Sequence, residues 1–340
     1  MTRYCAVAVT QGESPRAING IDLPENTAAA LAKAGGALVR TVYLAIADSE
    51  DDTLATEPVE VTGQSSTTEP TAEPQIAAVL GYHRPHTAQQ KLTAIGGSRQ
   101  LWDGLITFAQ QQSLQEPDIT VIKYDLDHNG TELTTNSDAH YRQTTEFTCG
   151  PVAVLTAMYR LGIAPKPTRD EELQMWREAT IAVACEPYGL ALAAERRGAH
   201  PTIRVSSAGP VLHPDSRLGI LDAAMARDTQ QAFERQVHER GVPVEIKPFD
   251  ANDIAALVDA GHMVVVLIDE LHMHGEACPH WITVTGRDQS SGALLIDDPW
   301  TDADFGETSV DACQMPVLPK DLDLMIRYDT PRSAQAMLIF

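Results

Sequence analysis

A loop runs into a helix in the stretch Gln143-Thr-Thr-Glu-Phe-Thr-Cys149-Gly-Pro-Val-Ala-Val-Leu155. Within and just after this stretch, apolar residues recur at helical spacing, at Val154, Leu155, Met158 and Leu161. The spacing predicts a helix with one buried face that ends near Gly162, because glycine readily terminates helices. Thr148 is the expected N-cap, and Pro151 fits the first turn, where its missing N–H costs nothing.

Cys149 is therefore expected at the N-terminus of this helix. Backbone N–H groups and the positive end of the helix dipole stabilise a thiolate there. Gly150 adds no side chain beside the sulfur, which leaves room for a carbonyl compound to approach. The alternative is that Cys149 is a small buried hydrophobe, the commoner fate of a free cysteine. A nucleophilic cysteine also needs a base and a group that orients the base.

A predicted β-hairpin supplies a candidate base. It consists of two strands and the turn between them, residues 280–287, 293–299 and 288–292. If Arg287 pairs with Ala293, then His280 and Asp298 share one face of the sheet and Asp297 points the other way. A slip of one residue would exchange the two aspartates. The alternation pattern alone thus leaves the choice between Asp297 and Asp298 open.

Length and composition narrow the class of protein. The 340 residues are 43% hydrophobic and 21% charged, as in a globular protein of one large or two modest domains. A net charge of −22 argues against a nucleic-acid partner. The sequence contains no run of eighteen apolar residues, so no membrane span is predicted. The N-terminus is unlike a signal peptide. With five scattered cysteines, we expect an acidic, cytoplasmic protein with reduced thiols.

The first third of the chain alternates strand and helix patterns. Strands are predicted at 4–9, 37–47, 76–82 and 119–124, and helices at 24–34 and 99–112. Residues 49–74, which are acidic and rich in Thr, Ser and Pro, are predicted to be a loop. No recognisable chemistry is found here. We therefore predict an α/β extension or lobe at 1–135, of structural or substrate-selecting role, and a second domain at 136–340.

The order Gln143, Cys149, His280, Asp298 resembles that of the papain-like cysteine peptidases. Within them, Gln-x5-Cys-Gly-Pro, the stretch His280-Trp-Ile-Thr-Val-Thr-Gly286 and Asp298-Pro are most similar to cysteine-peptidase family thirty-nine. That family includes the leader peptidases of bacteriocin exporters. The resemblance covers about residues 140–305 and leaves 1–135 uncovered. No transporter domain is present, so the leader-peptide substrate does not carry over.

The resemblance implies a papain-like α+β fold, in which a helical part carrying the cysteine packs on an antiparallel sheet carrying the histidine and aspartate. It implies Cys149 as nucleophile, His280 as general base, Asp298 as its orienting group and Gln143 as an oxyanion-hole donor. The implied activity is hydrolysis of a peptide or small amide through a thioacyl-enzyme. An acyl or peptidyl transferase with the same site, and a non-catalytic peptide-binding protein, are the alternatives.

Several other residues are candidates for a functional role. Glu186, Tyr188, Trp281 and His274 are assigned to substrate contact. The run from His272 to His280 looks like a metal cluster, but a catalytic His280 should not be a ligand, so neither metal nor cofactor is expected. Thr168 with Glu171 predicts a capping box, and Glu172 a charge that complements the helix dipole. No phosphate-binding loop is visible, and the oligomeric state is not specified.

Overall fold

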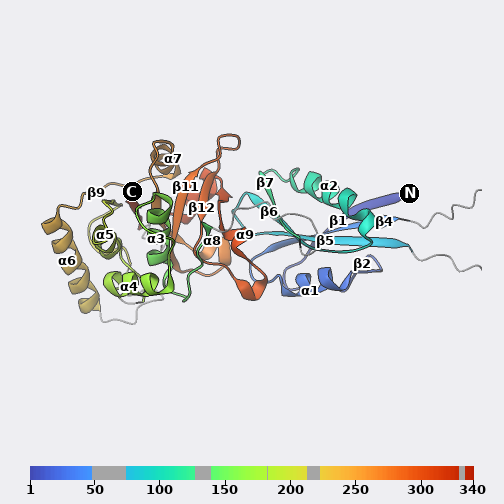
Figure 1. Ribbon diagram of the computed structural model, residues 1–340, viewed down its shortest axis with the longest axis horizontal. Coiled ribbons are helices and arrows are strands. Elements are labelled where there is room, and N and C mark those ends of the chain that lie inside the picture. The colour runs from blue at the N-terminus through green and yellow to red at the C-terminus, as the bar shows by residue number, and fades with distance from the viewer. Residues whose placement is uncertain (48–73, 127–138, 182, 213–222, 329–333) are drawn as a thin grey trace, which may run out of the picture.

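The computed structural model describes residues 1–47, 74–126, 139–181, 183–212, 223–328 and 334–340. These residues form two α+β parts, each built around its own sheet (Figure 1). The predicted α+β class is therefore confirmed. The domain boundary predicted between 135 and 136, and nearly all of the loop predicted at 49–74, lie outside the described residues.

The N-terminal part is organised around a five-stranded sheet with the order β1-β4-β5-β6-β7, antiparallel except for the parallel pair β6-β7. Its strands are β1 (Thr2–Val9), β4 (Val39–Ala47), β5 (Gln75–His83), β6 (Gln89–Gly97) and β7 (Val121–Asp125). Around it lie β2 (Ala17–Ile18), β3 (Ile21–Asp22), α1 (Glu25–Lys33), η1 (Arg99–Leu101) and α2 (Trp102–Ser113).

A helix covers each face of this sheet (Figure 1). On one face Leu31 of α1 packs in a cluster with Leu44 of β4, and on the other Leu105 of α2 packs with Tyr43, the neighbouring residue of the same strand. Because successive strand residues point to opposite faces, β4 is apolar on both sides. This explains why the strand patterns at 37–47 and 76–82 are nearly continuous apolar runs.

The C-terminal part contains a seven-stranded sheet with the order β13-β12-β11-β10-β14-β8-β9, antiparallel except for β8-β9. Its strands are β8 (Thr202–Val205), β9 (Val244–Ile246), β10 (Val264–Asp269), β11 (Pro279–Arg287), β12 (Leu294–Asp297), β13 (Met315–Val317) and β14 (Ala336–Ile339). Its helical elements are α3 (Cys149–Arg160), α4 (Arg169–Ala179), α5 (Pro187–Glu195), α6 (Ala223–Arg240), α7 (Ala251–Asp259), α8 (Leu271–His274), η3 (Ala303–Phe305), α9 (Ser309–Ala312) and α10 (Pro319–Met325).

Two separate cores hold this second sheet between helices. Val265 and Leu267 of β10 belong to the core formed with α3, α4 and α5, whereas Val264 and Val266 belong to the core formed with α7 and α10. All six residues of β10 are consequently buried. The arrangement places α3 directly on β11, where the hydroxyl of Thr283 donates a 2.8 Å hydrogen bond to the Ala153 carbonyl.

The two parts meet through polar groups at α9, which lies between them in Figure 1. Lys91 of β6 forms an ion pair of 2.6 Å with Asp311, and the Gln89 side chain donates to the Asp311 carbonyl at 2.6 Å. Lys123 of β7 donates to the Val310 carbonyl at 2.9 Å. All three donors are buried. The sequence analysis left β6 unassigned, because these polar residues do not follow the apolar pattern of an interior strand.

Candidate active site

Cys149 is the first residue of α3, as predicted, and only 5% of it is exposed. Thr148 occupies the N-cap position, but its hydroxyl makes no capping hydrogen bond and instead donates to Glu172. Gly150 does not leave space beside the sulfur. A Cβ there would lie 3.1 Å from both Leu190 and Trp281, so Gly150 permits close packing of α3 against α5 and β11.

His280 lies near the start of β11 and pairs with Asp298, which follows β12. The Nε2 atom of His280 is 2.7 Å from Oδ1 of Asp298. This contact occupies Nε2 of His280. Cys149 lines the same pocket as His280 and is among the groups that raise the pKa of His280. The site thus brings together a thiol, an imidazole and a carboxylate, the three groups that nucleophilic catalysis by a cysteine requires.

The hairpin that brings His280 and Asp298 together departs from the predicted pairing at its turn. Arg287 pairs with Leu294, not with Ala293. A register shift between Val284 and Gly286 then moves the pairing by one residue, so that Thr283 pairs with Asp297. A β-bulge of this kind inserts one residue and restores the alternation beyond it. At the open end the register is consequently the predicted one, with Asp298 on the side of His280.

Asp297 points to the other side of the sheet and is also buried. Its carboxylate forms an ion pair with Arg160 of α3 and accepts the backbone N–H of Gln314 at 2.9 Å. Asp297 therefore ties α3 to the β12–β13 connection, a structural function that the sequence did not reveal.

Charged neighbours determine the protonation of the pair. Burial opposes the charged form of His280, but the carboxylates of Asp298 and Glu270 outweigh it and raise the pKa of His280 well above its ordinary value. Burial would likewise raise the pKa of Asp298, but His280 and Arg84 hold it well below its ordinary value. The geometry therefore favours an imidazolium next to an ionised carboxylate at neutral pH.

Gln143 lies in the loop that precedes α3, six residues before Cys149. Its backbone N–H donates to the Pro299 carbonyl at 2.9 Å, and its side-chain Nε2 donates to the Thr145 carbonyl at 2.8 Å. A side-chain amide carries two N–H donors, so one remains for a ligand at the pocket. The side chain is buried and lines the same pocket as Cys149.

Glu172, predicted only to complement the dipole of α4, holds this loop in place. The side chain is fully buried, and its carboxylate accepts hydrogen bonds from the Tyr141 hydroxyl at 2.8 Å and the Thr144 backbone N–H at 2.7 Å, besides that from Thr148. A buried carboxylate with three donors is well satisfied. It fixes the path of the chain on both sides of Gln143 and up to Cys149.

A pocket of about 420 Å³ opens over Cys149. The predicted site residues that line it are Gln143, Cys149, His274 and His280. Its remaining walls combine carboxylates with apolar side chains, namely Glu146, Glu270, Glu276, Asp302, Phe147, Val183, Cys278, Pro279, Trp300 and Phe305. None of the described residues lining it is Lys or Arg.

Three residues assigned to substrate contact lie in the interior instead. Glu186 is fully buried and accepts the backbone N–H of Leu212 at 2.7 Å; burial raises its pKa to about 7. Tyr188 is part of the core beneath α3. Trp281 is buried and donates its indole N–H to the Cys185 carbonyl at 3.1 Å. None of the three lines the pocket, because the helix entry and the strand turn these side chains inward.

The part of the chain that the structure describes contains neither a metal-binding cluster nor a membrane-spanning helix. No group of three or more His, Cys, Asp or Glu side chains there is arranged to hold a metal ion. In the same residues, no helix combines the length and apolar character needed to cross a membrane.

Comparison with known proteins agrees with the geometry. The α+β part that carries Cys149 is a cysteine peptidase-like scaffold. A family model described as Peptidase_C39 like family matches residues 139–340, and the chain belongs to this family. The resemblance noted in the sequence is therefore confirmed. The comparison with curated proteins gives no match.

Proposed function

We propose that this protein is a cysteine peptidase or amidase that cleaves a peptide or small-amide bond through a thioacyl-enzyme. The observation that carries the proposal is that Cys149 and His280 line one pocket and that His280 lies 2.7 Å from the carboxylate of Asp298. Family membership supports the same scaffold but assigns no activity to it.

The proposed reaction has two steps, acylation of Cys149 and hydrolysis of the resulting thioester. The Cys149 thiolate attacks the substrate carbonyl carbon, and the oxyanion accepts hydrogen bonds from the Gln143 side chain and the backbone N–H of Cys149. The His280 imidazolium gives its proton to the departing amine, which leaves a thioester on Cys149. Neutral His280 then takes a proton from water, which attacks the thioester. The carboxylic acid is released, and the Cys149 thiolate and the His280 imidazolium are restored. Asp298 stays ionised throughout and orients the ring.

Limited alkylation tests the nucleophile without knowledge of the substrate. We expect iodoacetamide to modify Cys149 about tenfold or more faster than the other four cysteines, because a helix N-terminus and an imidazolium favour its thiolate. Burial raises the pKa of Cys185 and of Cys313, which keeps both as unreactive thiols. Peptide mass spectrometry after a limiting dose gives the order of modification.

Cys278 provides the matched control for this experiment, because it lines the same pocket and is more exposed than Cys149. Access alone would favour Cys278. Faster modification of Cys278, or an unchanged Cys149 rate in a His280→Gln variant, would contradict the proposed nucleophile and base.

The walls of the pocket predict a preference for substrate charge. Four carboxylates and no lining Lys or Arg make it attractive to cations. In a library of internally quenched peptides, we expect sequences with Lys or Arg beside the scissile bond to have kcat/KM about tenfold or more above those with Asp or Glu. High salt should reduce the difference, since it screens exposed charges. Preferential cleavage of acidic peptides would exclude this pocket as the binding site.

A further inference from the structure

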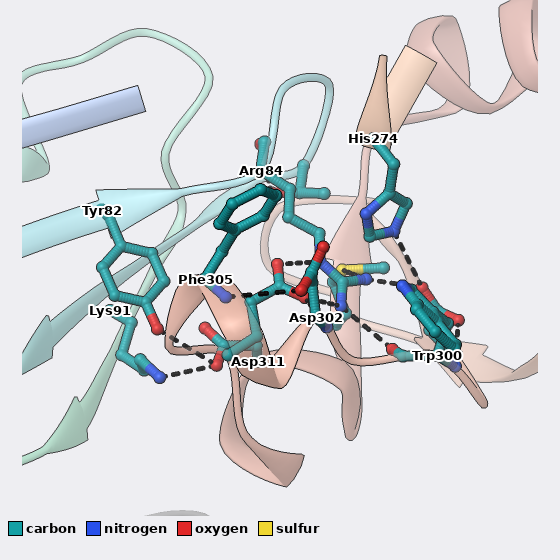
Figure 2. A network of polar contacts seen from close by, with 12 residues as sticks. Tyr82, Arg84, Lys91, His274, Trp300, Asp302, Phe305 and Asp311 are labelled. Atoms are coloured by element: carbon teal, nitrogen blue, oxygen red, sulfur yellow. Dashed lines mark hydrogen bonds and ion pairs between the residues drawn. The ribbon is translucent and has the colours of Figure 1, made fainter. Parts of the chain in front are cut away.

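Arg84 connects the N-terminal part directly to the candidate site. It follows β5, yet its guanidinium lies in the C-terminal part, with 1% of the side chain exposed. Nη1 contacts Oδ2 of Asp298 at 2.5 Å, and Nη2 donates to the Trp300 carbonyl at 3.0 Å. Nε and Nη2 hold the two oxygens of Glu307 at 2.6 and 2.7 Å. Figure 2 shows Arg84 at the centre of this network, beside Trp300.

We propose that Arg84 is a positioning residue of the Cys149 site, so that the N-terminal part completes the catalytic machinery. This inference rests on the proposed function, in which His280 transfers protons. Arg84 would act through Asp298 and would touch neither the substrate nor the reacting atoms. The N-terminal part, for which the sequence suggested only a structural or substrate-selecting role, would then be required for the chemistry.

The two oxygens of Asp298 have different partners. Oδ1 accepts from His280 and from the Trp300 backbone N–H at 2.8 Å. Oδ2 accepts from Arg84 at 2.5 Å and lies farther, 3.8 Å, from Nε2 of His274. A planar guanidinium with several donors fixes a carboxylate in both position and rotation. Arg84 therefore holds Asp298 with Oδ1 toward the imidazole.

The same contact shares the negative charge of Asp298 between two cations. An unshared buried carboxylate would hold the imidazolium more tightly, and a tightly held imidazolium is a poorer acid toward the departing amine. Glu307 limits this sharing in turn, because its carboxylate accepts two hydrogen bonds from the same guanidinium. The balance between Glu307 and Asp298 for one guanidinium thereby adjusts how readily His280 gives up its proton.

The charged groups around His280 come from several elements. Asp298, Glu270 and Cys149 are the groups that raise the pKa of His280, and of these Asp298 is in direct contact with it. His274 and Arg84 face Asp298, and Glu307 and Asp311 face Arg84. Because Arg84 is the only arginine or lysine among these groups, its substitution changes the field at His280 in a defined direction.

The test is the titration of His280, followed by NMR on full-length protein with histidine labelled at the imidazole Cε1 carbon. The signal is assigned by its loss in His280→Gln. In Arg84→Met we expect the His280 titration midpoint to move upward, since Asp298 is no longer shared. In Glu307→Gln we expect it to move downward, since Arg84 is then left to Asp298 alone. Opposite shifts from two partners of one ion pair would not arise from loss of structure.

Lys91→Met is the matched control. Lys91 is a buried cation of the same interface that pairs with Asp311 (Figure 2) and lies over the ring of Tyr82. Its hydrogen bonds and ion pairs go to Asp125, Thr308 and Asp311, not to Asp298. We expect its melting temperature to fall and its His280 midpoint to stay at the wild-type value. If Arg84→Met does not fold, Glu307→Gln still tests the proposal, because that variant keeps the cation paired.

An unchanged or lowered His280 midpoint in folded Arg84→Met, or an unchanged or raised midpoint in Glu307→Gln, would overturn the role of Arg84. Failure of the proposed function is a different result. It would be seen in the wild-type protein, as preferential alkylation of a cysteine other than Cys149.

Discussion

Asp298→Asn is expected to lower turnover by about 10²–10⁴-fold. The Asn side chain keeps the shape of Asp, but only one of its two ends is an acceptor. If the oxygen faces His280 and the Trp300 N–H, the amide NH₂ faces the Arg84 guanidinium, donor against donor. If the amide flips, the NH₂ group faces Nε2 of His280 and the imidazolium loses its partner. Turnover of the best library peptide, measured beside a melting curve, gives the loss.

Asp297→Asn is the neighbouring control and should separate stability from catalysis. It weakens the ion pair with Arg160 while its oxygen still accepts the Gln314 N–H, so we expect a lower melting temperature with turnover within a few-fold of wild type. The sequence analysis treated Asp297 only as the residue pointing away from His280. An inactive Asp297→Asn beside a folded, active Asp298→Asn would mean that the two carboxylates have been assigned in the wrong order.

Local signals carried the correct parts of the sequence analysis. Apolar spacing located α3. Of the capping box predicted at Thr168, one half is found: the Thr168 side chain accepts the Glu171 backbone N–H at 3.3 Å, whereas the Glu171 carboxylate pairs with Arg197. Both depend on residues a few positions apart, which a sequence displays directly. The position of Cys149 at a helix N-terminus follows from the same short-range pattern.

The hairpin shows how an inference can reach the right residue by a wrong step. The Arg287–Ala293 pairing was wrong by one residue, and the bulge between Val284 and Gly286 was not foreseen. The two errors cancel at His280 and Asp298. Alternation of apolar and polar residues does not mark this bulge, because Thr, Gly and Arg at its site are compatible with either register.

Long-range polar contacts were beyond the reach of the sequence. Arg84 and Asp298 are 214 residues apart, and Arg84 stands in a segment with no recognisable motif. Glu172 occupies the first turn of a helix, where an acidic residue is common. It is buried and hydrogen-bonded only because the loop of residues 141–148 folds over it. Buried charges of this kind are recognised by their partners, and the partners are defined only by the fold.

Two buried cations of the N-terminal part, Arg84 and Lys91, form ion pairs near the two ends of the segment 298–311. Arg84 contacts Asp298 and Glu307, and Lys91 contacts Asp311, so the chain from 298 to 311 is held by cations from the first sheet. Removal of one partner from a buried ion pair is costly, because it leaves the other charge uncompensated. The N-terminal part therefore supports the segment that begins with Asp298.

Gln143→Ala is expected to lower turnover by about 10²–10³-fold, the usual cost of removing one oxyanion-hole donor. The loss should be in kcat more than in KM, because the oxyanion exists only in the transition state and the tetrahedral intermediate. Kinetics on the best library peptide give the two constants.

Gln143 also braces its own loop through the 2.8 Å contact with the Thr145 carbonyl, so a structural effect must be separated from a catalytic one. Alkylation of Cys149 by iodoacetamide makes this separation, because it needs the thiolate and passes through no oxyanion. We expect Gln143→Ala to retain the wild-type alkylation rate. Gln143→Glu keeps the length of the side chain but places a carboxylate where negative charge develops, and should lose at least as much turnover as the alanine variant. Wild-type turnover in Gln143→Ala would remove Gln143 from the reaction, and a parallel loss of turnover and alkylation would reduce it to a brace for the loop that carries Cys149.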